Sequence, residues 1–172
     1  MKLEGWIFNK VYLSLGSNIN NGISVLNDAY NELSKIAKDS EISSIYLTKP
    51  LGFAEQPEFT NAVCKLYVDF DPFQLLEHLM ELQNKFGRNN SFPNGPRILD
   101  LDLISYNDLV INTPLLKLPH PRMETRLFVL VPLMELDPVW INPLSKKTIT
   151  YLFNTACNNQ DVSGVKKVFI RK

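Results

Sequence analysis

The chain has 172 residues, of which 45% are apolar and 21% are charged. This length predicts one domain spanning residues 1–172, and the composition excludes collagen-like, low-complexity and intrinsically disordered chains. The 18 basic and 18 acidic residues cancel, so no global electrostatic field draws the chain to nucleic acid or to an anionic membrane. Any anion-binding site must therefore be a local cluster of charges.

Cysteine usage and hydropathy predict a cytoplasmic protein that does not associate with a membrane. Cys64 and Cys157 are too few for a disulfide framework, and no Cys or His spacing typical of zinc sites occurs. The opening MKLEGWIFNK lacks the apolar stretch of a signal peptide. The longest apolar run, Leu127–Met134, is broken by Pro132 and is far shorter than the ~20 residues that span a bilayer.

The first part of the chain predicts a strand, a helix and a second strand. Val11–Leu15 forms a short strand that leads into the loop Gly16-Ser17-Asn18. Apolar residues then recur at helical spacing; they are Ile23, Leu26, Tyr30, Leu33 and Ala37. Glu41–Tyr46 alternates enough to form the second strand, and the breakers of Lys49-Pro50-Leu51-Gly52 indicate a loop.

The middle of the chain predicts another strand and helix. Asn61–Val68 has period 2, which places one set of side chains on one face; the set is Ala62, Cys64, Leu66 and Val68. Asp71 suits an N-cap, and Pro72 suits the first helical position. We expect the helix to stop at Gly87 and to bury one apolar stripe, formed by Phe73, Leu76, Met80 and Phe86.

The remaining elements complete an α+β pattern. They begin with a strand over Leu99–Tyr106 and a proline-rich connection over Thr113–Pro121. Helices over Met123–Leu133 and Thr148–Cys157 follow, and a strand over Val165–Ile170 comes last. This order predicts a ferredoxin-like antiparallel sheet of the split βαβ type. We expect the helices to pack mainly on one face of the sheet, with additional elements at the C-terminus.

The sharpest chemical signal is the sequence LDLDL around Asp100 and Asp102. Residues two apart on a strand share a face, so the two carboxylates point together with Cα atoms about 6.6–7 Å apart. Carboxylates this close repel each other unless a cation lies between them, and paired hard oxygen ligands suit Mg²⁺. The alternative is a solvated strand face that carries two ordinary acidic residues.

Basic residues near this pair indicate a polyphosphate ligand. Arg88 and Arg97 bracket the loop that leads into the acidic strand, and His120 and Arg126 follow it. Guanidinium groups hold phosphate oxygens in bidentate fashion, and a metal–polyphosphate complex needs both acidic and basic partners. Taken singly, each arginine is better explained as a surface charge, and His120 is equally well explained as a structural residue of a Pro-rich turn.

Several common nucleotide-binding motifs are missing from the sequence. It contains no GxxxxGK[ST] P-loop, no GxGxxG dinucleotide fingerprint, no HRD or DFG element of protein kinases and no GxSxG elbow. A phosphate-handling site in this chain therefore needs a different architecture.

The motifs themselves resemble those of 6-hydroxymethyl-7,8-dihydropterin pyrophosphokinases of folate biosynthesis. The likeness runs from about residue 11 to residue 137 and includes YLSLGSN, TKPLGFAEQPEFTNAV, FGR, GPRILDLDLISY and LPHPRM. The resemblance implies a ferredoxin-like α+β fold. It also implies an enzyme that uses ATP and Mg²⁺ to transfer the β,γ-pyrophosphoryl unit to the pterin's hydroxymethyl oxygen, releasing AMP.

The resemblance assigns roles residue by residue. Asp100 and Asp102 match metal-binding aspartates that hold two Mg²⁺ ions with ATP, and as a catalytic role we expect Asp102, or a water on the metal, to take the hydroxyl proton. Arg88 and Arg97 match arginines on the mobile catalytic loop and its exit, with catalytic and ATP-binding roles. The other ATP-binding matches are Leu103, His120 and Arg126. The pterin-binding matches are Thr48, Leu51, Phe59, Asn61 and Phe128, of which the two Phe residues sandwich the ring and Asn61 reads its edge.

The sequence also departs from the family pattern, and other functions stay open. Gln83 replaces a usual Glu, Lys49 replaces a frequent Pro, the loop 89–94 has no Trp, and Leu115 and Lys117 replace an Arg and a hydroxyl residue. The alternatives are a Mg²⁺-dependent nucleotidyl transferase or phosphohydrolase and a non-catalytic ATP-sensing module. We expect small-molecule partners only, and a monomer that is either free or associated with, or fused to, other folate enzymes.

Overall fold

An antiparallel sheet of six strands forms the centre of the molecule, in a computed structural model that describes residues 2–3, 6–50, 55–87, 95–159 and 164–168. The strands are β3 (Asn9–Ser17), β4 (Asp39–Ile42), β5 (Tyr46–Thr48), β6 (Phe59–Val68), β7 (Asp100–Tyr106) and β10 (Val165–Lys167). Their order is β10-β5-β6-β3-β7, and β4 also pairs with β6. Because β3 lies between β6 and β7, these two strands form a split βαβ unit, as the sequence predicts.

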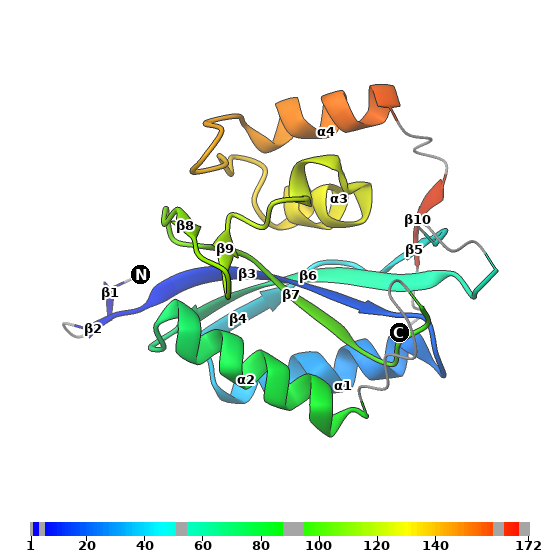
Figure 1. Cartoon of the computed structure of the whole chain (residues 1–172), viewed down its shortest axis with the longest axis horizontal. Helices are drawn as coiled ribbons and strands as arrows, with labels where there is room; N and C mark the ends of the chain where they lie inside the picture. The colour runs from blue at the N-terminus through cyan, green and yellow to red at the C-terminus, as the bar shows by residue number, and fades with distance from the viewer. Residues whose placement is uncertain (1, 4–5, 51–54, 88–94, 160–163, 169–172) are drawn as a thin grey trace.

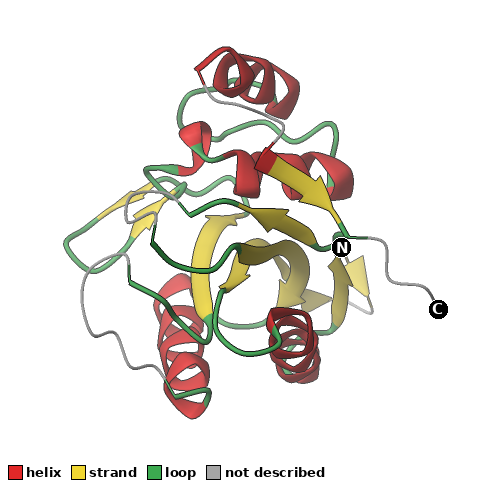
Figure 2. Cartoon of the chain, turned by 90° about the vertical axis from the view of Figure 1, so that its right-hand side faces the viewer, coloured by secondary structure: helices red, strands yellow, loops and turns green. Residues whose placement is uncertain are grey.

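Helices cover both faces of this sheet in layers (Figure 1, Figure 2). The helices α1 (Gly22–Lys35) and α2 (Pro72–Lys85) lie side by side against one face. The short η1 (Met123–Thr125) and the helix α3 (Leu127–Leu136) lie on the other face, and α4 (Ile149–Asn159) packs on the outer side of α3. The C-terminal elements therefore form a second helical layer beyond the ferredoxin-like unit.

Two small hairpins flank the sheet. One joins β1 (Lys2–Leu3) to β2 (Trp6–Ile7), and the other joins β8 (Ile111–Asn112) to β9 (Lys117–Leu118). The peptide bond between Leu118 and Pro119 is cis. It leads directly into His120, whose backbone N–H donates to the Ile104 carbonyl of β7 at 2.8 Å. This bond fixes His120 beside the sheet.

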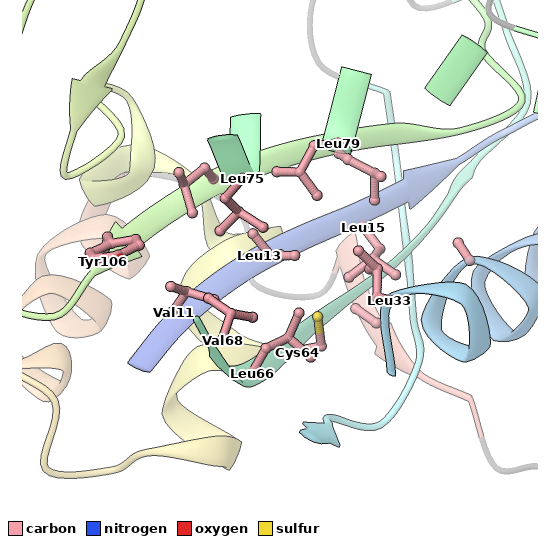
Figure 3. Close-up of a cluster of buried hydrophobic side chains, with 14 of the residues drawn as sticks. Val11, Leu13, Leu15, Leu33, Cys64, Leu66, Val68, Leu75, Leu79 and Tyr106 are labelled. Atoms are coloured by element: carbon pink, nitrogen blue, oxygen red, sulfur yellow. The ribbon is translucent and has the colours of Figure 1, made fainter. Parts of the chain in front are cut away.

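The face toward α1 and α2 holds a continuous apolar core (Figure 3). Residues two apart on a strand share a face, so β3, β6 and β7 each send one set of apolar side chains to these helices. Members of this core are Val11, Leu13 and Leu15 of β3, Cys64, Leu66 and Val68 of β6, Leu101 and Leu103 of β7, Leu26 and Leu33 of α1, and Leu75 and Leu79 of α2. Cys64 is fully buried, as expected for a packing cysteine.

The face toward α3 holds a second apolar core. Tyr12, Val63 and Ile104 of the sheet pack against η1, α3 and α4. The helix α3 is apolar around most of its circumference because it lies between the sheet and α4. It corresponds to the long apolar run of the sequence, and among the residues described no helix has the length and apolar character needed to cross a membrane.

Two predicted elements are each divided in the structure. The strand predicted over Glu41–Tyr46 is split between β4 and β5, because the Ser43 side chain takes part in the backbone pairing. Its Oγ accepts from the Val63 N–H at 3.1 Å, while the Ser43 N–H donates to the Val63 carbonyl at 2.9 Å. The helix predicted over Met123–Leu133 is η1 followed by α3, separated by Arg126 in an extended conformation.

The predicted inner face of α2 is wrong in part. The N-cap Asp71, the first-turn Pro72 and the stop at Gly87, whose φ is +80°, are confirmed. However, Phe73 and Met80 are 41% and 48% exposed. The buried stripe is formed by Leu75, Leu79 and Gln83, because a second set of residues at helical spacing meets the sheet instead. The predicted last strand is β10, which ends at Lys167, and residues 169–170 lie outside the described residues.

Candidate functional site

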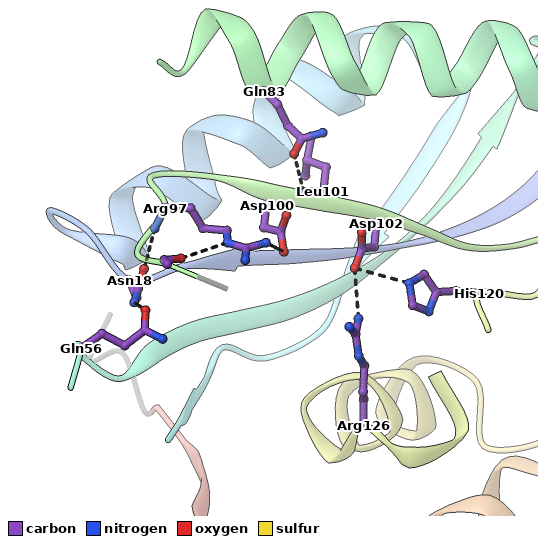
Figure 4. A network of polar contacts seen from close by, with 10 residues as sticks. Asn18, Gln56, Gln83, Arg97, Asp100, Leu101, Asp102, His120 and Arg126 are labelled. Atoms are coloured by element: carbon purple, nitrogen blue, oxygen red, sulfur yellow. Dashed lines mark hydrogen bonds and ion pairs between the residues drawn. The ribbon is translucent and has the colours of Figure 1, made fainter. Parts of the chain in front are cut away.

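The polar site lies at the end of the sheet that α3 leaves uncovered (Figure 4). Asp100 and Asp102 stand on the face of β7 opposite Leu101 and Leu103, which belong to the first core. Their cross-strand partners on β3 are Gly16 and Ser14. The prediction that the two carboxylates share one face of a strand is therefore confirmed.

A guanidinium group pairs with each carboxylate (Figure 4). Arg97 Nη1 lies 2.8 Å from Asp100 Oδ2, and Arg126 Nη1 lies 3.2 Å from Asp102 Oδ2. These arginines come from opposite sides of the site, since Arg97 precedes β7 and Arg126 stands at the start of α3. All four side chains are partly exposed, so solvent and ligands reach the ion pairs.

Asn18 fixes the chain that carries Arg97. Its Oδ1 accepts from the Arg97 N–H at 2.8 Å, and its own N–H donates to the Arg97 carbonyl at 3.2 Å. The Asn18 amide also donates to Gln56 Oε1 at 2.9 Å (Figure 4). The loop after β3 therefore sets the position of Arg97, a role of Asn18 that the sequence analysis did not assign.

A hollow with about 790 Å³ of empty space, including the part open to solvent, adjoins the ion pairs. Its lining combines aromatic, amide and charged side chains: Ser14, Gly16, Thr48, Lys49, Phe59, Asn61, Arg97, Asp100, Asp102, Arg122, Arg126 and Phe128. We call this hollow the ring cavity. It brings Phe59 from β6 and Phe128 from α3 to one place, although the two residues are far apart in sequence.

The floor of the ring cavity is backbone at Gly16. A Cβ at this position would lie 3.2 Å from Asn61 Oδ1 and 4.0 Å from Phe59 Cδ1. Glycine therefore leaves room for a flat ligand beside these two side chains. Asn61 is buried, and its amide nitrogen donates to Thr48 Oγ1 at 2.8 Å. This bond fixes the orientation of the amide that faces the cavity.

Arg126 links the ring cavity to the carboxylate pair. Its guanidinium carbon lies 5.4 Å from the centre of the Phe128 ring, within cation–π range, and its Nη1 contacts Asp102. One side chain therefore contacts both the aromatic wall and the acidic pair.

A second hollow opens on the other side of Asp102. We call it the outer cavity, and its lining is Leu76, Leu101, Asp102, Leu103, Pro114, Leu115, Leu116, Lys117, His120 and Pro121. Asp102 lines both cavities. A ligand that occupied both would therefore pass across this carboxylate.

His120 faces Asp102 as a neutral imidazole. Its Nδ1 accepts a hydrogen bond from the Arg122 N–H at 3.2 Å, so the neutral ring carries its proton on Nε2, which lies 3.8 Å from Asp102 Oδ2. Burial lowers the pKa of His120, and the positive charges of Arg126 and Arg122 lower it further against the opposing effect of Asp102. His120 therefore offers an N–H donor at the boundary between the two cavities.

The structure brings most of the predicted site residues together. Those that line the ring cavity are Thr48, Phe59, Asn61, Arg97, Asp100, Asp102, Arg126 and Phe128. Leu103 and His120 line the outer cavity, although most of the Leu103 side chain belongs to the first core. Leu51 and Arg88 lie outside the described residues, as does the loop 89–94.

Four residues of the ring cavity were missed by the sequence analysis. They are Ser14, Gly16, Lys49 and Arg122. Ser14 and Gly16 share the strand face that Asp100 and Asp102 occupy, so period 2 in β3 was a usable signal. Gln83, which departs from the family pattern, is buried and accepts from the Leu101 N–H at 3.3 Å. Gln83 therefore holds β7, the strand of Asp100 and Asp102, from the side on which α2 lies.

The carboxylate pair fits a divalent cation that takes only part of its ligands from protein. Asp100 and Asp102 present hard oxygen atoms on one strand face, which suits Mg²⁺. Among the described residues, no group of three or more His, Cys, Asp or Glu side chains gathers as a metal centre. A bound ion would therefore complete its coordination with water and with the phosphate oxygens of a ligand.

These features define a class of α+β domain in which a ferredoxin-like sheet carries an open, acidic and aromatic site on one face. Residues 12–138 match the family described as 7,8-dihydro-6-hydroxymethylpterin-pyrophosphokinase. The match covers well over half of the chain, and the chain belongs to this family.

Relatives and solved structures agree with this assignment. The chain is 39% identical over 139 residues to the 2-amino-4-hydroxy-6-hydroxymethyldihydropteridine pyrophosphokinase of Aquifex aeolicus, covering 81% of this chain and 87% of that protein. It is also 39% identical over 155 residues to the folic acid synthesis protein fol1 of Pneumocystis carinii, covering 89% of this chain and 21% of that protein. The chain thus spans about a fifth of the length of the first curated relatives it matches. A crystal structure of Plasmodium falciparum HPPK-DHPS with pterin and p-hydroxybenzoate shares the fold, with a TM-score of 0.78 at 14% identity over 96% of this chain and 48% of that one.

Proposed function

We propose that this chain transfers pyrophosphate from ATP to the hydroxymethyl group of 6-hydroxymethyl-7,8-dihydropterin, releasing AMP, as a step of folate biosynthesis. The observation that carries the proposal is that one open sheet face holds a carboxylate pair directly beside a cavity with two phenylalanines and a fixed amide. A polyphosphate needs the first feature and a flat heteroaromatic ring needs the second.

The ring cavity is the proposed pterin site. Phe59 and Phe128 supply aromatic faces for the ring, and Asn61, held by Thr48, supplies a donor and an acceptor for its edge. Leu51, which the family resemblance also assigns to this site, follows β5 outside the described residues. A ring bound here places its substituent toward Asp100 and Asp102.

The boundary between the two cavities is the proposed ATP site. His120 and Arg126 contact Asp102 there, Leu103 lines the outer cavity, and Arg97 approaches from the other side. Arg88 is assigned to this group by the family resemblance alone. Asp100 and Asp102 would hold two Mg²⁺ ions together with ATP, and these ions supply neutralisation of the phosphate charge.

The two ion pairs of the site suggest how the arginines act. Arg97 and Arg126 now neutralise the two aspartates. With Mg²⁺ held by Asp100 and Asp102, the guanidinium groups of Arg97 and Arg126 would be available to phosphate oxygens, which guanidinium groups bind in bidentate fashion. Both arginines would then act on ATP without leaving the site.

The proposed reaction is an in-line displacement at the β-phosphorus of ATP. The hydroxymethyl oxygen forms a bond to this phosphorus while the bond from the β-phosphorus to the oxygen of the α-phosphate breaks, so AMP leaves with the bond's electron pair. The hydroxyl proton passes to Asp102 or to water. The chain contributes mainly by positioning the two substrates and balancing charge, with Arg88, Arg97 and Asp102 as the proposed catalytic residues.

One assay separates this function from its alternatives. The protein is incubated with ATP, Mg²⁺ and hydroxymethyl-dihydropterin, and AMP and phosphate are quantified. Release of AMP that depends on the pterin supports the proposal. Phosphate release without pterin indicates a phosphohydrolase, and tight ATP binding without turnover indicates a sensing module. Either of these results overturns the proposal.

We further propose that residues 1–172 act as one domain and as a monomer that takes small molecules as its only substrates. The pairing of β10 with β5 supports the single domain, since it joins the last described strand to the central sheet. Light scattering after gel filtration tests the oligomeric state, and a dimeric mass contradicts it.

A further inference from the structure

Within the described residues, one arginine of the ring cavity has no acidic partner, whereas the other two each have one. Arg97 pairs with Asp100 and Arg126 pairs with Asp102. Arg122 lines the same cavity, yet in the part of the chain that the structure describes no ion pair joins it to a carboxylate. Its charge is therefore available to a ligand.

The backbone of Arg122 is held firmly beside the cavity. Its N–H donates to His120 Nδ1 at 3.2 Å, and its carbonyl accepts from Thr125 Oγ1 at 3.3 Å. The next residue, Met123, is fully buried in the second core. The Arg122 side chain thus extends from a fixed point, which lowers the entropy cost of holding a ligand.

The charge of Arg122 also reaches the groups around the aspartate pair. Burial is the largest cause that lowers the pKa of Arg126, and the charge of Arg122 lowers it further. Arg122 likewise contributes to the lowered pKa of His120. These effects agree with the position of Arg122 in the lining of the same cavity as Arg126 and Asp102.

The charges of the ring cavity leave an excess of positive charge. Its cations are Lys49, Arg97, Arg122 and Arg126, and its anions are Asp100 and Asp102. A neutral pterin does not balance this excess, whereas a phosphate group does. Two of these cations have no ion pair with a carboxylate among the residues that the structure describes. Of these, Lys49 adjoins Thr48 at the end of β5, and Arg122 adjoins the aspartate side.

We propose that Arg122 binds the pyrophosphoryl unit as it is transferred and remains bound to the diphosphate of the pterin product. Arg122 lines the ring cavity and not the outer cavity, so it meets the phosphates nearest to the ring. Its planar guanidinium matches the oxygen geometry of phosphate. The inference rests on the proposed function, because it takes the ring cavity as the pterin site.

The test compares two ligands that differ only in the diphosphate. The affinity of the whole protein for hydroxymethyl-dihydropterin and for its diphosphate ester is measured by fluorescence titration in the presence of Mg²⁺. For Arg122→Gln we expect affinity for the ester to fall about tenfold, as for a lost charge-assisted hydrogen bond, with affinity for the bare pterin unchanged. Arg122→Lys restores part of the loss, and Lys38→Gln, which removes an exposed charge between α1 and β4, changes neither affinity.

Two results overturn the inference while leaving the proposed function intact. In one, Arg122→Gln binds both ligands as the unchanged protein does. In the other, it loses the same factor for both ligands, which indicates damage to the ring cavity. If the unchanged protein binds neither ligand, the proposed function itself fails, and the role of Arg122 fails with it.

Discussion

The two faces of the sheet are built from the same strands, but helices cover them to different extents. On β3, Val11, Leu13 and Leu15 all point into the core formed with α1 and α2. On the other face only Tyr12 is packed beneath the C-terminal helices, while Ser14 and Gly16 line the ring cavity. The fully covered face provides stability, and the half-covered face leaves a rigid polar platform for chemistry.

The start of α3 marks the boundary on the half-covered face. Arg126 and Phe128 belong to the site, whereas Val129 and Leu130 are fully buried in the second core. Neighbouring residues at the start of α3 therefore serve the site in two cases and the apolar core in the other two. Because packing in the second core fixes the backbone of α3, Arg126 and the Phe128 ring have little conformational freedom.

The largest expected effect on the half-covered face is that of Asp102→Asn. We expect turnover to fall about 10³-fold, because the amide neither neutralises a cation nor takes a proton. The free energy of unfolding should change by no more than about 1 kcal/mol, since the ion pair with Arg126 is partly exposed. Pterin-dependent AMP release and urea denaturation measure the two quantities.

Asp108→Asn is the matched control, because Asp108 is exposed in the turn after β7. It should leave turnover unchanged. Near-normal turnover in Asp102→Asn would show that the metal-binding assignment is wrong.

For Leu13→Ala on the covered face we expect the opposite result, a large loss of stability with little change in turnover. Leu13 is fully buried between the two strands that flank β3 and the helices α1 and α2. Removing three carbon atoms from such a core costs about 2–5 kcal/mol of unfolding free energy. Turnover per folded molecule should stay within about twofold, because no Leu13 atom faces the site.

Leu144→Ala is the control for that change, since Leu144 is 64% exposed and its truncation should have little effect. If Leu13→Ala were as stable as the unchanged protein, the covered face would not carry the stability assigned to it.

The faces of the strands could be predicted from the sequence, whereas the face of α2 could not. Period 2 in Asn61–Val68 and in LDLDL specifies which side chains share a face, because a strand allows only two faces. In α2, Phe73, Leu76 and Met80 form one apolar stripe and Leu75, Leu79 and Leu82 another. Only packing against β7 decides which stripe is buried, and that contact is not encoded locally.

Prediction of the site has the same limit, because contacts between distant elements are not encoded locally. Asp100 and Asp102 were predictable as a pair because they are two residues apart on one strand. Their partners were not predictable from spacing: Arg126 reaches Asp102 only because α3 packs on the opposite face from α1 and α2. Arg122 was missed since a single arginine in a turn reads as a surface charge until the cavity beside it is known.

Gly16→Ala is the third prediction and tests the floor of the ring cavity. The added Cβ would lie 3.2 Å from Asn61 Oδ1 and would occupy space that the pterin needs. We expect affinity for hydroxymethyl-dihydropterin to fall about tenfold, the loss that corresponds to about 1.4 kcal/mol, while stability is nearly unchanged because the Gly16 φ is not positive. Fluorescence titration measures the affinity.

Gly164→Ala is its control, because a Cβ at Gly164 would meet no atom of the described residues within 4 Å. Unaltered pterin affinity in Gly16→Ala would place the ring elsewhere on the sheet.

The smallest expected effect concerns Glu135, through which α3 is attached to Ser44 and to Tyr46 of β5. Burial raises the pKa of Glu135, but hydrogen bonds donated by Tyr46 and Ser44 outweigh it and lower the pKa below the ordinary 4.5. A lowered pKa in the folded state means that ionised Glu135 stabilises the fold above the unfolded pKa, and that this stabilisation is lost as the pH falls through the folded pKa. Glu135→Gln should therefore be less stable by about 1 kcal/mol at neutral pH, with the difference shrinking as the pH falls through the lowered pKa of Glu135.

Urea denaturation at several pH values checks this expectation, with Glu77→Gln on the exposed side of α2 as the control. A constant difference between Glu135→Gln and the unchanged protein at all pH values would mean that the charge of Glu135 is irrelevant and that only its shape matters. In that case the half-covered face would owe the position of α3 to apolar packing alone, as the covered face does for α1 and α2.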